Sequence, residues 1–307
     1  MKLSRHRLGL FSLVLLVLTS GCGYVNGIRA KSQLNEAVSA YKSSKYEAAE
    51  QHARKALELD PANENATLIL AIILQAQYRP LDASDPNRMK AEEAIGLYRQ
   101  IEEKNPNDEQ AFKAVTVLFD YLARASERQI LEAEEQSRKS RPKAEKLRWT
   151  EEADRRRKEA ARLSEEQLAW VKKRAENKTV ADPGRSEAYA FLAENKLRCS
   201  KAITERNVQP ARTNGGSLAV KFKKPEDPVE YDKAVQCINE GLELAYTALS
   251  LNVESEAALA AKYRLLLEAG KLARMGGDEK KAAEYERQAV RGRDQETGDG
   301  RSKTASY

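Results

Sequence analysis

Small residues recur at a fixed distance before a proline in two separate stretches of the chain. Ala49 stands twelve residues before Pro61, and Ala94 stands twelve residues before Pro106. Ala56 follows Ala49 by seven residues, on the same face of a helix that Pro61 would end. A helical unit that repeats must stack, because one unit alone cannot bury its apolar face. The repeat therefore restricts the fold to a series of packed helices.

These stretches resemble the second helix of the tetratricopeptide repeat (TPR), in which a small alanine lies near the start and a proline follows the end. The string KALELDP, residues 55–61, carries the resemblance most clearly. Further along, Phe112, Val115 and Phe119 fill the large apolar positions of a first helix. The resemblance implies an all-α fold, a right-handed α-solenoid of about five TPR-like helical hairpins over residues 31–290.

The chain departs from the family's spacing at one place. Pro61 and Pro106 are 45 residues apart, whereas the TPR unit has about 34 residues. The extra residues fit a turn-rich insert over Arg79–Met89, RPLDASDPNRM. The resemblance is strongest over residues 31–124 and weakest over residues 229–290.

A charged stretch, residues 126–160, interrupts the repeats and is broken by Pro142. We expect a charged helical insert that projects as a hairpin. One interpretation is a solvated face with ion pairs four residues apart. The other is a contact for an acidic partner or lipid phosphates, made by Arg155, Arg156 and Arg157.

A second irregular stretch, residues 207–228, predicts a long loop, with a short strand as the alternative because Leu218, Val220 and Phe222 alternate with other residues. It joins two predicted helices that carry Cys199 and Cys237. Each cysteine is seven or eight residues from the turn, so both lie about 10–12 Å from it. We expect a disulfide between them; two buried free thiols are the alternative.

The N-terminus has the three zones of an export signal. Lys2, Arg5 and Arg7 precede an apolar run over residues 8–18. This run is shorter than the roughly 20 residues that a membrane-spanning helix needs. Small residues then lead to Cys22.

The run LTSGC, residues 18–22, resembles the bacterial lipobox, although Thr19 stands where leucine is usual. The resemblance implies a signal peptide over residues 1–21, acylation of Cys22, and a lipid-bearing tether over residues 22–30. Cleavage nearby with a free thiol is the alternative. Gly23, where aspartate would favour the inner membrane, implies the periplasmic face of the outer membrane of a Gram-negative bacterium.

Charge argues against nucleic acid as a partner. The chain has 307 residues, of which 33% are charged, and a formal net charge of +6. Loss of residues 1–21 would remove Lys2, Arg5 and Arg7 and no acid, which leaves +3. Both signs are interspersed, and an exported, anchored protein rarely meets nucleic acid. The polar stretch 291–307 has no apolar periodicity and predicts a disordered tail.

No catalytic pattern is present, so we expect no enzyme activity, no cofactor and no metal. His52 is the single histidine after the predicted signal peptide, and neither a nucleotide-binding glycine pattern nor a zinc-protease motif occurs.

The sequence instead predicts a membrane-anchored scaffold or adaptor for envelope proteins or peptides; a stoichiometric structural subunit of an envelope assembly or secretion machine is the alternative. Lipoproteins of similar architecture assist barrel assembly, pilus secretin assembly or the control of cell-wall enzymes. The expected groove contacts come from first helices: Tyr41, Leu74, Phe119 and Lys196.

Overall fold

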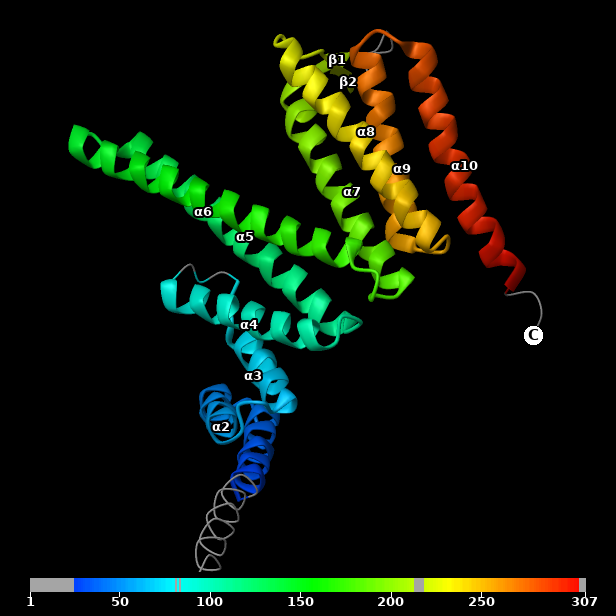
Figure 1. Ribbon diagram of the computed structural model, residues 1–307. Coiled ribbons are helices and arrows are strands. Elements are labelled where there is room, and N and C mark those ends of the chain that lie inside the picture. The colour runs from blue at the N-terminus through cyan, green and yellow to red at the C-terminus, as the bar shows by residue number, and fades with distance from the viewer. Residues whose placement is uncertain (1–24, 81, 83, 213–217, 304–307) are drawn as a thin grey trace, which may run out of the picture. The chain divides into compact units, whose positions relative to one another are not determined.

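The computed structural model describes residues 25–80, 82, 84–212 and 218–303, and helices account for most of this length (Figure 1). Side chains are described for these residues except 210–221 and 292–303. The chain divides into two compact units, unit 1 (Met1–Gln167) and unit 2 (Leu168–Tyr307).

Unit 1 is a series of helical hairpins. Successive helices pack on each other, α2 on α3, α3 on α4 and α4 on α5. The helical segment that precedes α2 contacts it through His52, whose Nδ1 lies 2.8 Å from Oε1 of Gln33. The described helices are residues 25–42, α2 (Tyr46–Leu59), α3 (Glu64–Gln77), α4 (Asp85–Lys104), α5 (Glu109–Lys139) and α6 (Lys143–Glu176), which continues into unit 2.

Unit 2 continues the same architecture. Its α7 packs on both α8 and α9, and α9 packs on α10. The all-α class and its helical hairpins are therefore confirmed, with one small sheet added. The elements that follow α6 are α7 (Asp182–Thr204), the 3₁₀ turn η1 (Glu205–Asn207), β1 (Val208–Arg212), β2 (Leu218–Phe222), α8 (Pro228–Leu251), α9 (Glu256–Met275) and α10 (Glu279–Lys303).

One four-residue turn recurs between hairpins. Asn63, Asp108 and Ser255 each begin a helix, and each side chain accepts a hydrogen bond from the backbone N–H three residues later. The backbone N–H of each also bonds the carbonyl three residues earlier, at 3.0–3.1 Å. Such caps satisfy N–H groups that a helix start leaves unpaired. The turn therefore sets where each new hairpin begins.

Unit 2 also holds a buried ion pair. Glu268 of α9 is 3% exposed, and its Oε2 lies 2.7 Å from Nζ of Lys271. Ser200 and Thr204 of α7 donate hydroxyl hydrogen bonds to the other carboxylate oxygen. A buried charge is costly unless it is paired and hydrogen-bonded. This network supplies both and joins α7 to α9.

Most of the predicted N-terminal tether is helical. Backbone from residue 25 onward is helical, and Ala30 and Ala37 are both fully buried. They lie seven residues apart, the same spacing as Ala49 and Ala56, so they pack as a repeat helix does. The prediction of a tether to residue 30 is wrong from residue 25. Residues 1–24, with the predicted signal peptide and Cys22, lie outside the described residues.

The charged stretch is helical on both sides of Pro142, as predicted, but it extends two long helices of the repeat array. Most of the charged stretch 126–160 is the far part of two long helices, α5 and α6, which are joined at residues 140–142 around Pro142. Ala133 and Ala153 are each 2% exposed, so small residues continue the packing outward. Of the stretch 79–89, only 79–84 precedes α4, because Pro86 occupies the first turn of that helix, where proline is tolerated.

The predicted loop over residues 207–228 contains an antiparallel β-hairpin. Val208 pairs with Phe222 and Arg212 with Leu218. The alternation of Leu218, Val220 and Phe222 was therefore a strand signal, and the irregular loop was the wrong choice. The predicted disordered tail is likewise helical in backbone through Lys303. No proline occurs between residues 291 and 303 to force an end.

A disulfide joins α7 to α8. Sγ of Cys199 is bonded to Sγ of Cys237, with their Cα atoms 6.1 Å apart and a sequence separation of 38. The two cysteines were expected to lie at similar heights above the turn, and the structure places them so.

We predict that this bond forms in the purified protein and stabilises unit 2. Protein isolated without reductant should take up no alkylating agent at Cys199 or Cys237 by mass spectrometry, and should take up two after reduction. Cys237→Ser should lower the free energy of unfolding by about 2–4 kcal/mol. Two alkylated thiols in unreduced protein would contradict the disulfide.

A second prediction concerns a close helix approach. A Cβ on Gly241 of α8 would lie 2.6 Å from Cδ2 of Leu265 and 3.1 Å from Cβ of Lys196. Gly241→Val should therefore lower the free energy of unfolding, measured by urea denaturation, by about 1–3 kcal/mol through overpacking. Gly96→Ala is the control, since nothing lies within 4 Å of its Cβ position, and it should raise stability by about 0.4–1 kcal/mol. A Gly241→Val protein as stable as wild type would show that the helices can separate.

Candidate protein-binding groove

Unit 2 has a groove of about 550 Å³ between three helices. Its walls come from the last part of α6, from α7 and from α8, and the last two lie side by side in Figure 1. On α7, Tyr189, Leu192 and Lys196 follow one another at intervals of three and four residues, so they share a helical face. On α8, Glu240 and Leu244 are four residues apart, so they also share a helical face.

The floor of the groove is apolar and half-buried. It is formed by Leu168, Tyr189, Leu192 and Leu244. Tyr189 also packs against a small core of buried alanines, which includes Ala190. The floor is therefore continuous with the packed interior, so its side chains are held in place while one side of each remains accessible.

The rim is charged. The Lys196 ammonium donates a hydrogen bond to the Glu240 carboxylate, and Nε2 of Gln236 donates another at 2.7 Å. These two hydrogen bonds hold the pKa of Glu240 below its ordinary value, and the bond from Lys196 has the larger effect. The stability that this pair contributes is thus present at neutral pH and is lost as the pH falls through that lowered pKa.

The groove carries an excess of negative charge. Three carboxylates line it, Glu176, Glu240 and Glu243, against two ammonium groups, Lys172 and Lys196. Glu176 lies 3.8 Å from Lys172, and Glu240 is bonded to Lys196. Among the described residues, Glu243 has no ion-pair partner, and its side chain is exposed. One carboxylate is therefore left to meet a cation from outside.

The four residues predicted as groove contacts have different positions. Lys196 lines the groove. Tyr41 is half-buried against Tyr46, with ring centroids 5.8 Å apart. Leu74 is 0% exposed and Phe119 is 2% exposed, so the prediction of surface contacts was wrong for both. The large apolar residues of first helices here fill the space between stacked helices.

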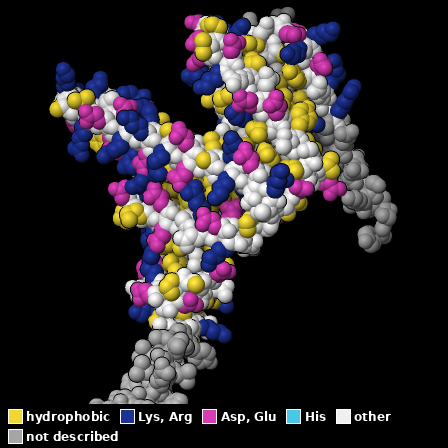
Figure 2. All heavy atoms as spheres, in the orientation of Figure 1, with side chains coloured by type: hydrophobic (Ala, Val, Ile, Leu, Met, Phe, Trp, Pro, Cys, Tyr) yellow, Lys and Arg dark blue, Asp and Glu magenta, His cyan; other side chains and the backbone are white. Residues whose placement is uncertain are grey.

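The three arginines of the charged hairpin are all ion-paired. Arg155 pairs with Glu152; Arg156 pairs with Glu152 and Glu159, at 2.8 and 3.2 Å. Arg157 pairs with Glu134 and Asp154. Basic and acidic side chains are accordingly mixed along the visible face of α5 and α6 (Figure 2). For these three arginines, the arrangement fits the solvated, ion-paired face.

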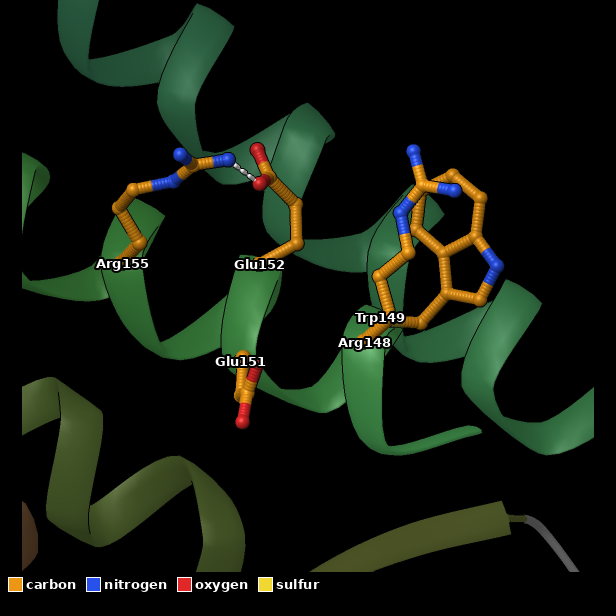
Figure 3. A pocket seen from close by; sticks show the side chains of 5 residues that line it. All are labelled: Arg148, Trp149, Glu151, Glu152 and Arg155. Carbon is orange, nitrogen blue, oxygen red and sulfur yellow. Dashed lines mark ion pairs between the residues drawn. The ribbon is translucent and has the colours of Figure 1, made fainter. Parts of the chain in front are cut away.

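A hollow of about 490 Å³ lies beside this part of α6. The side chain of Arg155 reaches toward Glu152, while Arg148 lies over the Trp149 ring at 5.8 Å and Glu151 points away (Figure 3). Its labelled residues all belong to one helix, and Arg155 and Glu152 are paired with each other. The groove of unit 2, lined by three helices, is therefore the stronger candidate for a binding site.

A metal-ion site or a membrane-spanning helix would each indicate another class of function. Within the described part of the chain, no group of three or more histidine, cysteine, aspartate or glutamate side chains could hold a metal ion. Over the same residues, every helix is too short or too polar to cross a bilayer.

Comparisons with known proteins bear on the fold. The chain matches neither a family model nor a curated protein. TTC0263, a thermophilic TPR protein of Thermus thermophilus, is similar at 13% identity and a TM-score of 0.25, over 85% of this chain and 98% of that one. PilF of Pseudomonas aeruginosa is similar at 17% identity and a TM-score of 0.23, over 87% and 92%. With TM-scores this low, the fold class rests on the hairpins and turns described above.

Proposed function

We propose that this chain is a protein-binding scaffold whose unit 2 groove holds an amphipathic helical segment of a partner. The observation that carries the proposal is the combination of an apolar floor with an excess carboxylate at the rim. A groove of this kind accepts apolar side chains spaced three or four residues apart on a helix. Solenoids of helical hairpins offer such surfaces along their length.

The charges of the groove define the partner further. A lysine or arginine beside the apolar anchor would meet Glu243, whose carboxylate has no ion-pair partner among the described residues. An acidic partner would instead place like charges together, which disfavours the complex. The partner segment is therefore apolar on one side and basic at its edge. The proposal gives the chain no catalytic role and no cofactor.

We also propose that the scaffold is exported and lipid-anchored at Cys22, on the periplasmic face of the outer membrane. Its support is the order of basic, apolar and small residues over 1–21, followed by that cysteine. The Cys199–Cys237 bond is further support, because disulfides persist in oxidising compartments.

Synthetic peptides test the groove. A fluorescein-labelled helical peptide with leucines and lysines on one face should bind about tenfold more tightly than a twin with glutamates in place of the lysines. Fluorescence anisotropy measures both affinities. Leu192→Asp should abolish binding, and Glu243→Lys should remove the preference for the basic peptide.

Glu254→Lys is the matched control, because it makes the same charge change at an exposed residue outside the groove. It should leave both affinities unchanged, and circular dichroism should show every variant folded. Equal affinity for the two peptides, or an equal effect of Glu243→Lys and Glu254→Lys, would refute the groove as the site.

Labelling of cells with radioactive palmitate tests the anchor. The wild-type protein should incorporate label and stay with membranes after an alkaline wash. Cys22→Ser should do neither, because a thioether-linked lipid needs the thiol. Cys199→Ser serves as the control for loss of a cysteine and should still incorporate label. Unlabelled wild-type protein in the soluble fraction would rule out the anchor.

A further inference from the structure

The first described helix, residues 25–42, has an exposed stripe whose chemistry changes along its length. Val25 is 45% exposed and Ile28 is 57% exposed, and Arg29 and Lys31 beside them are exposed as well. Farther along the same stripe, at helical spacing, the exposed residues are polar or acidic: Ser32, Asn35, Glu36 and Ser39. Apolar character is thus confined to the end nearest the N-terminus, where Arg29 and Lys31 accompany it, and an exposed Lys42 lies at the far end of the helix.

The stripe cannot turn inward to bury these side chains. Ala30 and Ala37, on the opposite side of the helix, are both 0% exposed. Gln33 is held to α2 through His52, at 2.8 Å. The orientation of the helix within unit 1 is therefore fixed, and Val25 and Ile28 remain at the surface.

The position of Cys22 indicates what covers this surface. Val25 is three residues after Cys22, which is at most about 11 Å of chain even when fully extended. We infer that the first two turns of this helix lie in the membrane surface, with Val25 and Ile28 among the lipid chains near the headgroups and Arg29 and Lys31 at lipid phosphates. This inference rests on the proposed lipid anchor at Cys22.

The charges select an anionic phospholipid surface. Long basic side chains can reach headgroup phosphates while neighbouring apolar side chains enter the interface. Attraction between basic residues and anionic lipid falls off within about a Debye length of the surface, roughly 10 Å. Glu36 and Ser39 are about 12 and 16 Å from Ile28 along the helix. The polar part of the stripe therefore stays in water, with the helix axis rising from the membrane surface after its first two turns.

Spin labels test the inference in the full-length protein. Ile28→Cys and, as the matched control, Ser39→Cys each add one thiol to the same exposed stripe, and each variant is labelled with the same nitroxide. The proteins are purified in detergent and reconstituted into vesicles of phosphatidylethanolamine and phosphatidylglycerol. Electron paramagnetic resonance then compares collisions of each label with oxygen, which concentrates in lipid, and with a water-soluble nickel complex.

The label at position 28 should collide severalfold more with oxygen than with nickel, and the label at position 39 should show the reverse. A position 28 label that favours nickel would overturn the inference. So would a label shielded from both reagents, which would mean that protein covers the stripe. If the position 28 label were immersed equally in vesicles of phosphatidylcholine alone, the proposed attraction of Arg29 and Lys31 to anionic lipid would be refuted.

Acylation of Cys22 is measured separately, by mass spectrometry of the N-terminal peptide. An acylated Cys22 with a water-exposed label at position 28 would leave the proposed anchor intact and end this inference. If Cys22 carries no lipid, the anchor fails, and the same labels in a Cys22→Ser background decide the inference by the same collision ratios.

Discussion

Close packing of helices through small residues is the constraint on which the structure depends. Ala49 and Ala56 are buried completely, as are Ala30 and Ala37 one helix earlier. Without long side chains between them, helix axes can approach until their backbones nearly touch, and each hairpin then covers the apolar face of the next. Gly241 is the extreme case, since a single methyl group there would meet Leu265 and Lys196.

This spacing is what made the fold predictable from the sequence. Alanines seven residues apart, and prolines after the helices, identify hairpins wherever both occur. The fifth hairpin was harder, because Val253 stands in its entry turn where Pro61 and Pro106 stand in the others. The cap at Ser255 was the remaining signal. The strand over Leu218–Phe222 was predicted only as the alternative to a loop, because a five-residue alternation weighs little in a chain dominated by helices.

The candidate groove was predictable only in part. Of the residues predicted as groove contacts, Lys196 lines the groove, whereas Leu74 and Phe119 are core residues. A single sequence shows which helix a residue belongs to, but two faces of a first helix can both be apolar, one toward a neighbour and one toward solvent. Only the stacking decides between them. The arginines of α6 likewise cannot be judged without knowing that Glu134, from another helix, reaches Arg157.

The recurring turn between hairpins has a consequence for how such a chain can evolve. Each turn is complete within four residues. Its last residue is Asn63, Asp108 or Ser255, whose side chain accepts a hydrogen bond from the helix that it begins. The backbone N–H of the same residue donates to the carbonyl of the residue that ended the previous helix. Its geometry needs nothing from elsewhere in the molecule. Whole hairpins can therefore be duplicated or lost between two such turns, and the length of the solenoid can change one hairpin at a time.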